Sequence, residues 1–232
     1  MGIHVIVFDF DGTLIESNRL KYDAYFSLFP ADDRHAAVIR SVLSRAFEQS
    51  RYLVLEEILR ALGGRGGSPA DEVERLARRY NEIVVAGAKT CPEKAGAEAA
   101  LKRLSPLYGL YVSSTTPEPA LREIVRYRKW DGYFRRVFGF PRKKPDTLRE
   151  IMQRENAASG QVLVVGDGES DRRSAMENRC PFVHVAPGFR FADLARALEN
   201  GGWETGDHVV PAGGAGRGRD LTFSGSSGDG SA

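Results

Sequence analysis

One stretch near the N-terminus constrains the fold more than any other. Four apolar residues at positions 5–8 precede Asp9, Asp11, Gly12 and Thr13. The apolar run is rich in β-branched residues, too short for a helix and ended by an Asp-Gly turn signal, so it predicts a strand buried on both faces. Asp9 and Asp11 are two residues apart, which places both carboxylates on the same side of an extended chain. Carboxylates this close repel each other unless a cation or a shared proton intervenes, although a polar strand end followed by a turn is the plainer alternative.

Residues 16–88 have a pattern typical of helices alone. Apolar residues recur there at steps of three and four, with interruptions at Pro30 and at the glycine-rich stretch 63–67. That stretch lacks the lysine and the hydroxyl of a phosphate-binding loop and is predicted to be a turn. The region therefore predicts an all-helical domain inserted after the first strand.

From residue 89 onward, strand and helix patterns alternate, which predicts βαβ units and a parallel sheet. Strands are predicted at 109–113, 137–139, 161–165 and 181–185. Helices are predicted at 93–104, 119–127, 146–154 and 191–198, and a further helix is predicted to carry Ala175 and Met176. We therefore expect an α/β fold. Residues 1–15 and 89–210 would form a three-layer, Rossmann-like core with a central parallel sheet, residues 16–88 the helical domain, and residues 211–232, rich in Gly and Ser, a flexible tail.

The composition is that of an ordinary soluble globular protein, with 42% hydrophobic and 28% charged residues among 232. A formal net charge of +2 gives no reason to expect nucleic acid or an anionic membrane as a partner. No apolar run approaches the length of a membrane span, and the N-terminus lacks the features of a secretory signal. Cys91 and Cys180 lie far apart without metal-ligand spacing and are expected to be reduced. These features predict a cytoplasmic protein.

The predicted strands carry polar residues at their carboxyl ends, which is the edge where ligands bind an open parallel sheet. These residues are Asp9 and Asp11 after the first strand, Ser113, Ser114 and Thr115 after the second, Lys144 after the third, and Asp167 and Asp171 after the fourth. Four acids need a compensating charge, and carboxylate oxygens suit Mg²⁺ better than zinc, for which His and Cys ligands are scarce here. A hydroxyl, a lysine and a divalent cation facing one another would form a pocket for phosphate.

In this order, these segments resemble the four motifs of the haloacid dehalogenase superfamily of phosphohydrolases, and more closely its phosphoglycolate phosphatase-like branch. The resemblance covers roughly residues 3–185. Residues 9–13 match the first motif, the strand ending at Ser114 the second, Lys144 the third and residues 166–171 the fourth. Each piece alone is common, whereas the ordered set of four is specific. The helical domain at 16–88 resembles the family's cap domain.

The resemblance implies a Mg²⁺-dependent phosphatase that hydrolyses a small phosphorylated metabolite, a phosphomonoester, through an aspartyl-phosphate intermediate. It implies that Asp9 is the nucleophile and that Asp11 is first a general acid and then a general base. It also implies that the Asp9 carboxylate, the Asp11 backbone carbonyl and Asp167 hold Mg²⁺. Ser114 and Lys144 would hold the phosphoryl oxygens, with Lys144 stabilising charge in both stages.

The resemblance also assigns lesser roles. Thr115 stands where many relatives carry Asn or Ser and can still donate a hydrogen bond to a bound phosphate, and Gly12 allows the backbone to approach that phosphate closely. Asp171 is expected to support Lys144 or a metal-bound water rather than bind the metal directly; a helix N-cap is the alternative.

Two further assignments stay open at this point. Ser114 could cap the following helix instead of binding phosphate. Lys143 could take the role of Lys144, because the doublet leaves the register open. Substrate choice is expected to come from the cap, where Arg40, Arg45, Arg51 and Tyr52 are candidate contacts.

The same motifs are compatible with two other functions, that of a sugar-phosphate mutase and that of a catalytically weak regulatory protein that binds a phosphate ligand. The acid at Asp11 argues against a dehalogenase, which has no alkoxide leaving group to protonate. The expected partner is a small-molecule organic phosphate, with no nucleic acid and no membrane, bound by a monomer or a homodimer.

Overall fold

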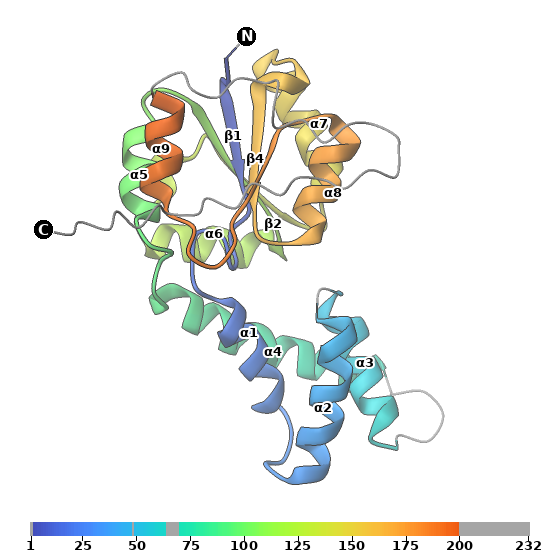
Figure 1. Cartoon of the computed structure of the whole chain (residues 1–232). Helices are drawn as coiled ribbons and strands as arrows, with labels where there is room; N and C mark the ends of the chain where they lie inside the picture. The colour runs from blue at the N-terminus through green and yellow to red at the C-terminus, as the bar shows by residue number, and fades with distance from the viewer. Residues whose placement is uncertain (1, 48, 64–69, 200–232) are drawn as a thin grey trace, which may run out of the picture. The chain divides into compact units, whose positions relative to one another are not determined.

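The computed structural model describes residues 2–47, 49–63 and 70–199 (Figure 1). The chain divides into two compact units, one of residues 1–15 and 93–232 and one of residues 16–92. The boundary predicted at 88/89 is thus four residues early, because the helix α4 (Ala70–Thr90) continues past it. The predicted tail at 211–232 and all but the first residue of the glycine-rich stretch 63–67 lie outside the described residues.

The first unit is built on a parallel sheet, as predicted, with the strand order β3-β2-β1-β4-β5 among the described residues. Its strands are β1 (Val5–Phe8), β2 (Gly109–Pro117), β3 (Arg136–Phe140), β4 (Val162–Gly166) and β5 (Phe182–His184). Its helices are α5 (Ala97–Leu104), α6 (Glu118–Tyr127), α7 (Lys144–Glu155), α8 (Glu169–Asn178) and α9 (Phe191–Glu199), with short 3₁₀ turns at Asp131–Tyr133 and Ser159–Gln161. Helices α7 and α8 cover one face of the sheet, and α5 and α9 cover the other (Figure 1). The expected three-layer α/β core is confirmed.

The strand order places a topological switch point beside β1. The chain passes from β1 through β2 to β3 on one side, then crosses back to β4 and β5 on the other. In the register of the sheet, Phe8 pairs with Val165 of β4, and the Asp9 N–H donates a 2.8 Å hydrogen bond to the Val165 carbonyl. The carboxyl ends of β1 and β4 therefore lie side by side, which is where open α/β sheets bind ligands.

Alternating side chains of β1 form the core on both faces of the sheet. Val5 and Val7 belong to the cluster that includes Leu148 of α7. On the opposite face the ring of Phe8 lies 6.3 Å, centroid to centroid, from that of Phe191 in α9. All four β1 residues are buried, as expected for a central strand covered by helices on both sides.

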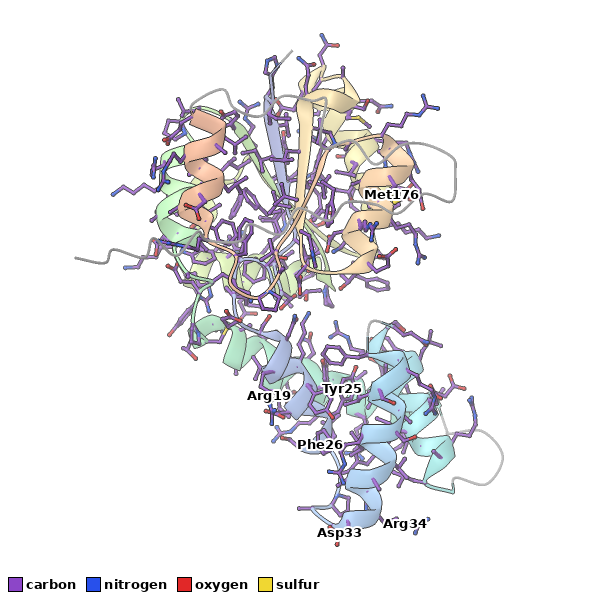
Figure 2. The ribbon with its side chains drawn as sticks, viewed as in Figure 1. Arg19, Tyr25, Phe26, Asp33, Arg34 and Met176 are labelled. Atoms are coloured by element: carbon purple, nitrogen blue, oxygen red, sulfur yellow. The ribbon has the colours of Figure 1, made fainter. Side chains whose placement is uncertain are left out.

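Some element boundaries differ from the sequence prediction for local reasons. The helix predicted at 93–104 begins only at Ala97, because Gly96 adopts a left-handed conformation (φ 77°) and Glu93 instead forms a bridge with Ile15. Strand β2 continues past the predicted residue 113 to Pro117. In α8, Ala175 is buried while Met176 points away from the sheet (Figure 2) and is 43% exposed.

The regular elements of the second unit are, among its described residues, the helices α1 (Asn18–Phe26), α2 (Asp33–Ala46), α3 (Arg51–Ala61) and α4. These helices enclose a core of their own whose fully buried members include Val42, Leu55 and Ile58. Asp32 caps α2 by accepting a 2.9 Å hydrogen bond from the His35 N–H. Among the described residues, no helix combines the length and the apolar character needed to cross a membrane.

Candidate active site

The carboxyl edge of the sheet brings together the aspartate that follows β1, a lysine from α7 and an aspartate from α8. The Lys144 Nζ atom donates hydrogen bonds to Asp9 Oδ1 at 2.8 Å and to Asp171 Oδ1 at 2.6 Å. All three side chains are buried. Lys143 is exposed, so the lysine in contact with Asp9 is Lys144.

Burial and charge act together on these groups. Burial opposes the charge on Lys144, but its ion pairs with Asp9 and Asp171 outweigh burial and hold the pKa of Lys144 above its ordinary value. Burial also raises the pKa of Asp9 to about 7, because the lowering effect of Lys144 is offset by the carboxylates of Asp171, Asp167 and Asp11. The pKa of Asp171 is raised, again mainly by burial. The ammonium group of Lys144 contacts two carboxyl groups, and two more act on Asp9, so the site favours a further positive charge.

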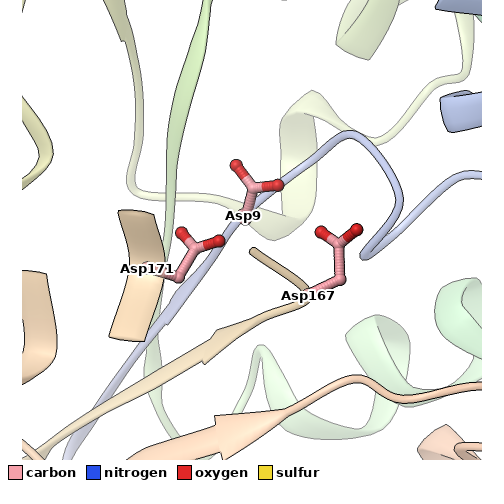
Figure 3. A group of neighbouring side chains, drawn as sticks. All are labelled: Asp9, Asp167 and Asp171. Atoms are coloured by element: carbon pink, nitrogen blue, oxygen red, sulfur yellow. The ribbon is translucent and has the colours of Figure 1, made fainter. Parts of the chain in front are cut away.

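Three carboxylates are close enough to share a metal ion. Oxygen atoms of Asp9, Asp167 and Asp171 all lie within 4.8 Å of one another (Figure 3). Carboxylate oxygens gathered in this way are the ligands that hard divalent cations bind in proteins. However, Asp171 directs Oδ1 to Lys144 and accepts at Oδ2 a 3.3 Å hydrogen bond from the Gly168 N–H. Asp9 and Asp167 are therefore the better placed pair, and the carboxylate of Asp11 is not part of this group.

Asp171 makes contacts that differ from the helix-capping alternative. Helix α8 begins at Glu169, and its N-cap residue is Gly168, so Asp171 is the third helical residue. Its side chain reaches back to the Gly168 N–H while also binding Lys144. The alternative interpretation of the sequence, in which Asp171 is the N-cap of α8, is therefore wrong, because the N-cap is Gly168.

Asp11 is held by hydroxyl groups from the end of β2. Thr116 Oγ1 donates a 2.7 Å hydrogen bond to Asp11 Oδ2, and Ser114 Oγ lies 3.4 Å from the same oxygen. Ser114 Oγ accepts in turn from the Thr116 N–H at 3.1 Å. Helix α6 has Pro117 at its N-cap position, so the alternative in which Ser114 caps that helix is wrong.

The loop after β1 is tied to the loop after β4. Gly12 has a φ of 77°, in the left-handed region that favours glycine. The next residue, Thr13, donates a 2.9 Å hydrogen bond from Oγ1 to Asp167 Oδ1. Behind Asp167, the His184 ring nitrogen Nε2 lies 3.2 Å from the Asp167 carbonyl oxygen. These contacts fix the position of the Asp167 carboxylate relative to β1.

Thr115 differs in exposure from the other polar residues at the end of β2. Its side chain is exposed, whereas those of Ser114 and Thr116 are buried. Sequence reasoning missed Thr116, Thr13 and His184 as contacts of the site. For Thr116 a signal was available, because a residue two positions after Ser114 in a continuing strand lies on the same side.

Two of the arginines considered for substrate contacts are engaged within the helical unit. Arg45 pairs with Glu57. Arg51 donates a 2.8 Å hydrogen bond to Asn81 Oδ1. Arg40 and Tyr52 are exposed.

Comparisons with known proteins agree with this arrangement. The model of the haloacid dehalogenase-like hydrolase family matches residues 3–176. A phosphoglycolate phosphatase of Cereibacter sphaeroides is 27% identical over 82% of this chain and 88% of its own length. The phosphoglycolate phosphatase of Escherichia coli K12 is 31% identical, over 54% of this chain and 53% of its own length. In fold, the chain is similar to the HAD-hydrolase YfnB of Bacillus subtilis bound to magnesium, with a TM-score of 0.68 and 16% identity over 86% of this chain and all of that one.

Proposed function

Because this chain belongs to the haloacid dehalogenase-like hydrolases and is a phosphatase, we propose that it hydrolyses a small phosphorylated metabolite through an aspartyl-phosphate on Asp9. The observation that carries the proposal is the buried ion pair between Lys144 and Asp9. The two residues are 135 positions apart in the chain, and a carboxylate oxygen of Asp167 lies within 4.8 Å of one of Asp9.

The proposed reaction has two displacements at phosphorus. In the first, an Asp9 carboxylate oxygen attacks the phosphorus atom, the bond to the leaving oxygen breaks, and Asp11 gives that oxygen its proton. In the second, a water molecule loses a proton to Asp11 and attacks the phosphorus atom, which regenerates the Asp9 carboxylate and releases inorganic phosphate. Lys144 orients Asp9 and, with Ser114, binds the phosphoryl oxygens.

We propose Mg²⁺ as the cofactor, held by Asp9, Asp167 and the backbone carbonyl of Asp11. When bound, the ion supplies the positive charge that keeps Asp9 ionised and attracts the phosphate dianion. The oxygen-only donor set supports this choice.

For the substrate we propose a small organic phosphate such as phosphoglycolate, after the relatives that carry that name. Residues 16–92 would act as the cap that selects it. Nucleic acid and membranes are not proposed partners, the location proposed is the cytoplasm, and the assembly proposed is a monomer or homodimer.

The test is phosphate release from a panel of phosphorylated metabolites and from p-nitrophenyl phosphate, with and without Mg²⁺. We expect activity that requires Mg²⁺ and disappears in Asp9→Asn and Lys144→Met. Lys143→Met is the matched control, because it removes an exposed neighbouring lysine and should retain activity. Activity that survives in Asp9→Asn would refute the proposal, and an isomerised product with little free phosphate would favour the mutase.

A further inference from the structure

Thr116 has no part in the chemistry proposed above, yet it makes the shortest of the described hydrogen bonds to the Asp11 carboxyl group. Its Oγ1 atom lies 2.7 Å from Asp11 Oδ2, compared with 3.4 Å for Ser114 Oγ. The residue is only 4% exposed, so water competes little for this hydrogen bond.

The end of β2 has an irregular shape that holds Thr116 in this position. Ser113 pairs with Phe138 and Pro117 with Phe140, so four residue steps in β2 lie opposite two in β3. Such bulges change the direction of side chains at the rim of a sheet. The β3 residue opposite is Gly139, where a Cβ atom would lie 2.5 Å from the Thr116 carbonyl oxygen. The β3 backbone thus approaches Thr116 so closely that a side chain at position 139 would displace it.

A hydroxyl group suits a carboxyl group that must change protonation state during a reaction. It donates a hydrogen bond to a carboxylate and accepts one from a carboxylic acid, and it rotates between the two. We propose that Thr116 is a positioning residue that holds the Asp11 carboxyl group in place while Asp11 protonates the leaving oxygen and then deprotonates water. This inference rests on the proposed function and assigns to Thr116 a role in the same reaction.

The leaving group provides a readout that a purely structural role would not change. An alkoxide departs slowly unless it receives a proton as its bond to phosphorus breaks, whereas p-nitrophenolate departs without one. Poor positioning of Asp11 should therefore slow the first displacement much more for an alkyl phosphate than for p-nitrophenyl phosphate. The second displacement is common to both substrates, so the comparison uses kcat/KM, which reports the steps up to departure of the leaving group.

The experiment compares kcat/KM for phosphoglycolate, or the best alkyl phosphate of the panel, with kcat/KM for p-nitrophenyl phosphate at saturating Mg²⁺. Thr116→Val removes the hydroxyl at nearly constant volume, and Thr116→Ser restores it. Thr147→Val is the matched control, because Thr147 is a buried threonine of α7 whose hydroxyl donates to the carbonyl of Lys143, the N-cap residue of that helix. Asp11→Asn serves as the background that lacks the proton donor.

We expect Thr116→Val to lower kcat/KM for the alkyl phosphate about tenfold, the loss of one well-formed hydrogen bond, and to change kcat/KM for p-nitrophenyl phosphate little. Thr116→Ser should recover most of the loss, and Thr116→Val should cost nothing further in Asp11→Asn. An equal fall of kcat/KM for both substrates, no fall, or a gain would overturn the role of Thr116 while leaving the proposed function intact. Activity that is independent of Asp9 would overturn both.

Discussion

A methyl group added at Gly166 tests the packing around Lys144 without removing any charged group. Gly166 ends β4, and a Cβ atom there would lie 2.3 Å from Asp171 Cγ and 2.5 Å from Asp171 Cβ. Contacts this short cannot persist, so Asp171 must move. Asp171 is 3% exposed and holds Lys144 at 2.6 Å, so its displacement also disturbs the contact between Lys144 and Asp9.

Two costs set the size of the effect of Gly166→Ala on stability. Overpacking a buried position costs about 1–3 kcal/mol, and weakening a hydrogen bond to a charged group costs about 1.5–3 kcal/mol. Because relaxation relieves part of each, we expect the free energy of unfolding to fall by about 2–4 kcal/mol. Displacing a catalytic group by about 1 Å costs on the order of 100-fold, so kcat should fall by about 10- to 100-fold.

Urea denaturation and phosphate release measure the two effects separately. Gly160→Ala is the control, because a Cβ atom at Gly160 would have nothing within 4 Å. Asp171→Asn keeps the shape of the side chain but removes its charge, so it should lose turnover with a smaller loss of stability than Gly166→Ala. If Gly166→Ala is as stable and as active as the wild type, Asp171 does not lie where the ion pair requires it, and the reasoning fails.

Three further predictions concern other parts of the chain. The backbone N–H of His35 holds the pKa of Asp32 below its usual value, so Asp32 stabilises the fold at neutral pH, and this contribution is lost as the pH falls through the lowered pKa. Asp32→Ala should therefore lower the melting temperature at pH 7, and the difference from the wild type should vanish in acid. Burial raises the pKa of Cys180 to about 12, so iodoacetamide at neutral pH should modify the partly exposed Cys91 and leave Cys180 intact until urea unfolds the chain. Equal alkylation rates of the two cysteines in the folded chain would contradict this. Among the described residues, Ser174 Oγ is a buried hydroxyl oxygen without a hydrogen-bond partner. In urea denaturation, Ser174→Ala should leave the free energy of unfolding unchanged or raise it by about 1 kcal/mol, and a clear loss of stability would show that the hydroxyl is hydrogen-bonded.

The central sheet was predictable because its strands are short apolar runs bounded by turn residues. The run at 5–8 had to be a covered strand, and the alternation after residue 89 required parallel pairing. Local sequence did not indicate where the helix before β2 begins, since Gly96 permits either continuation of a helix or a left-handed turn.

The candidate site was predictable in residue type but not in its contacts. Sequence could not choose between Lys143 and Lys144, because only the start of α7 determines which side chain is buried. Thr116 was missed because β2 was expected to end before it; once the strand continues, alternation places Thr116 on the same side as Ser114. The hydrogen bond itself joins residues 105 positions apart, which local sequence does not indicate.

The central claim is that Asp9 carries the phosphoryl group during turnover. It is tested most directly by mixing the wild-type protein with substrate and Mg²⁺, quenching in acid within a single turnover, and reducing the acyl phosphate with borohydride before peptide mass spectrometry. The account predicts conversion of Asp9 to homoserine in the wild type and its absence without substrate or in Asp9→Asn. Rapid phosphate release with no modification at Asp9, or with the phosphoryl group on another residue, would contradict it.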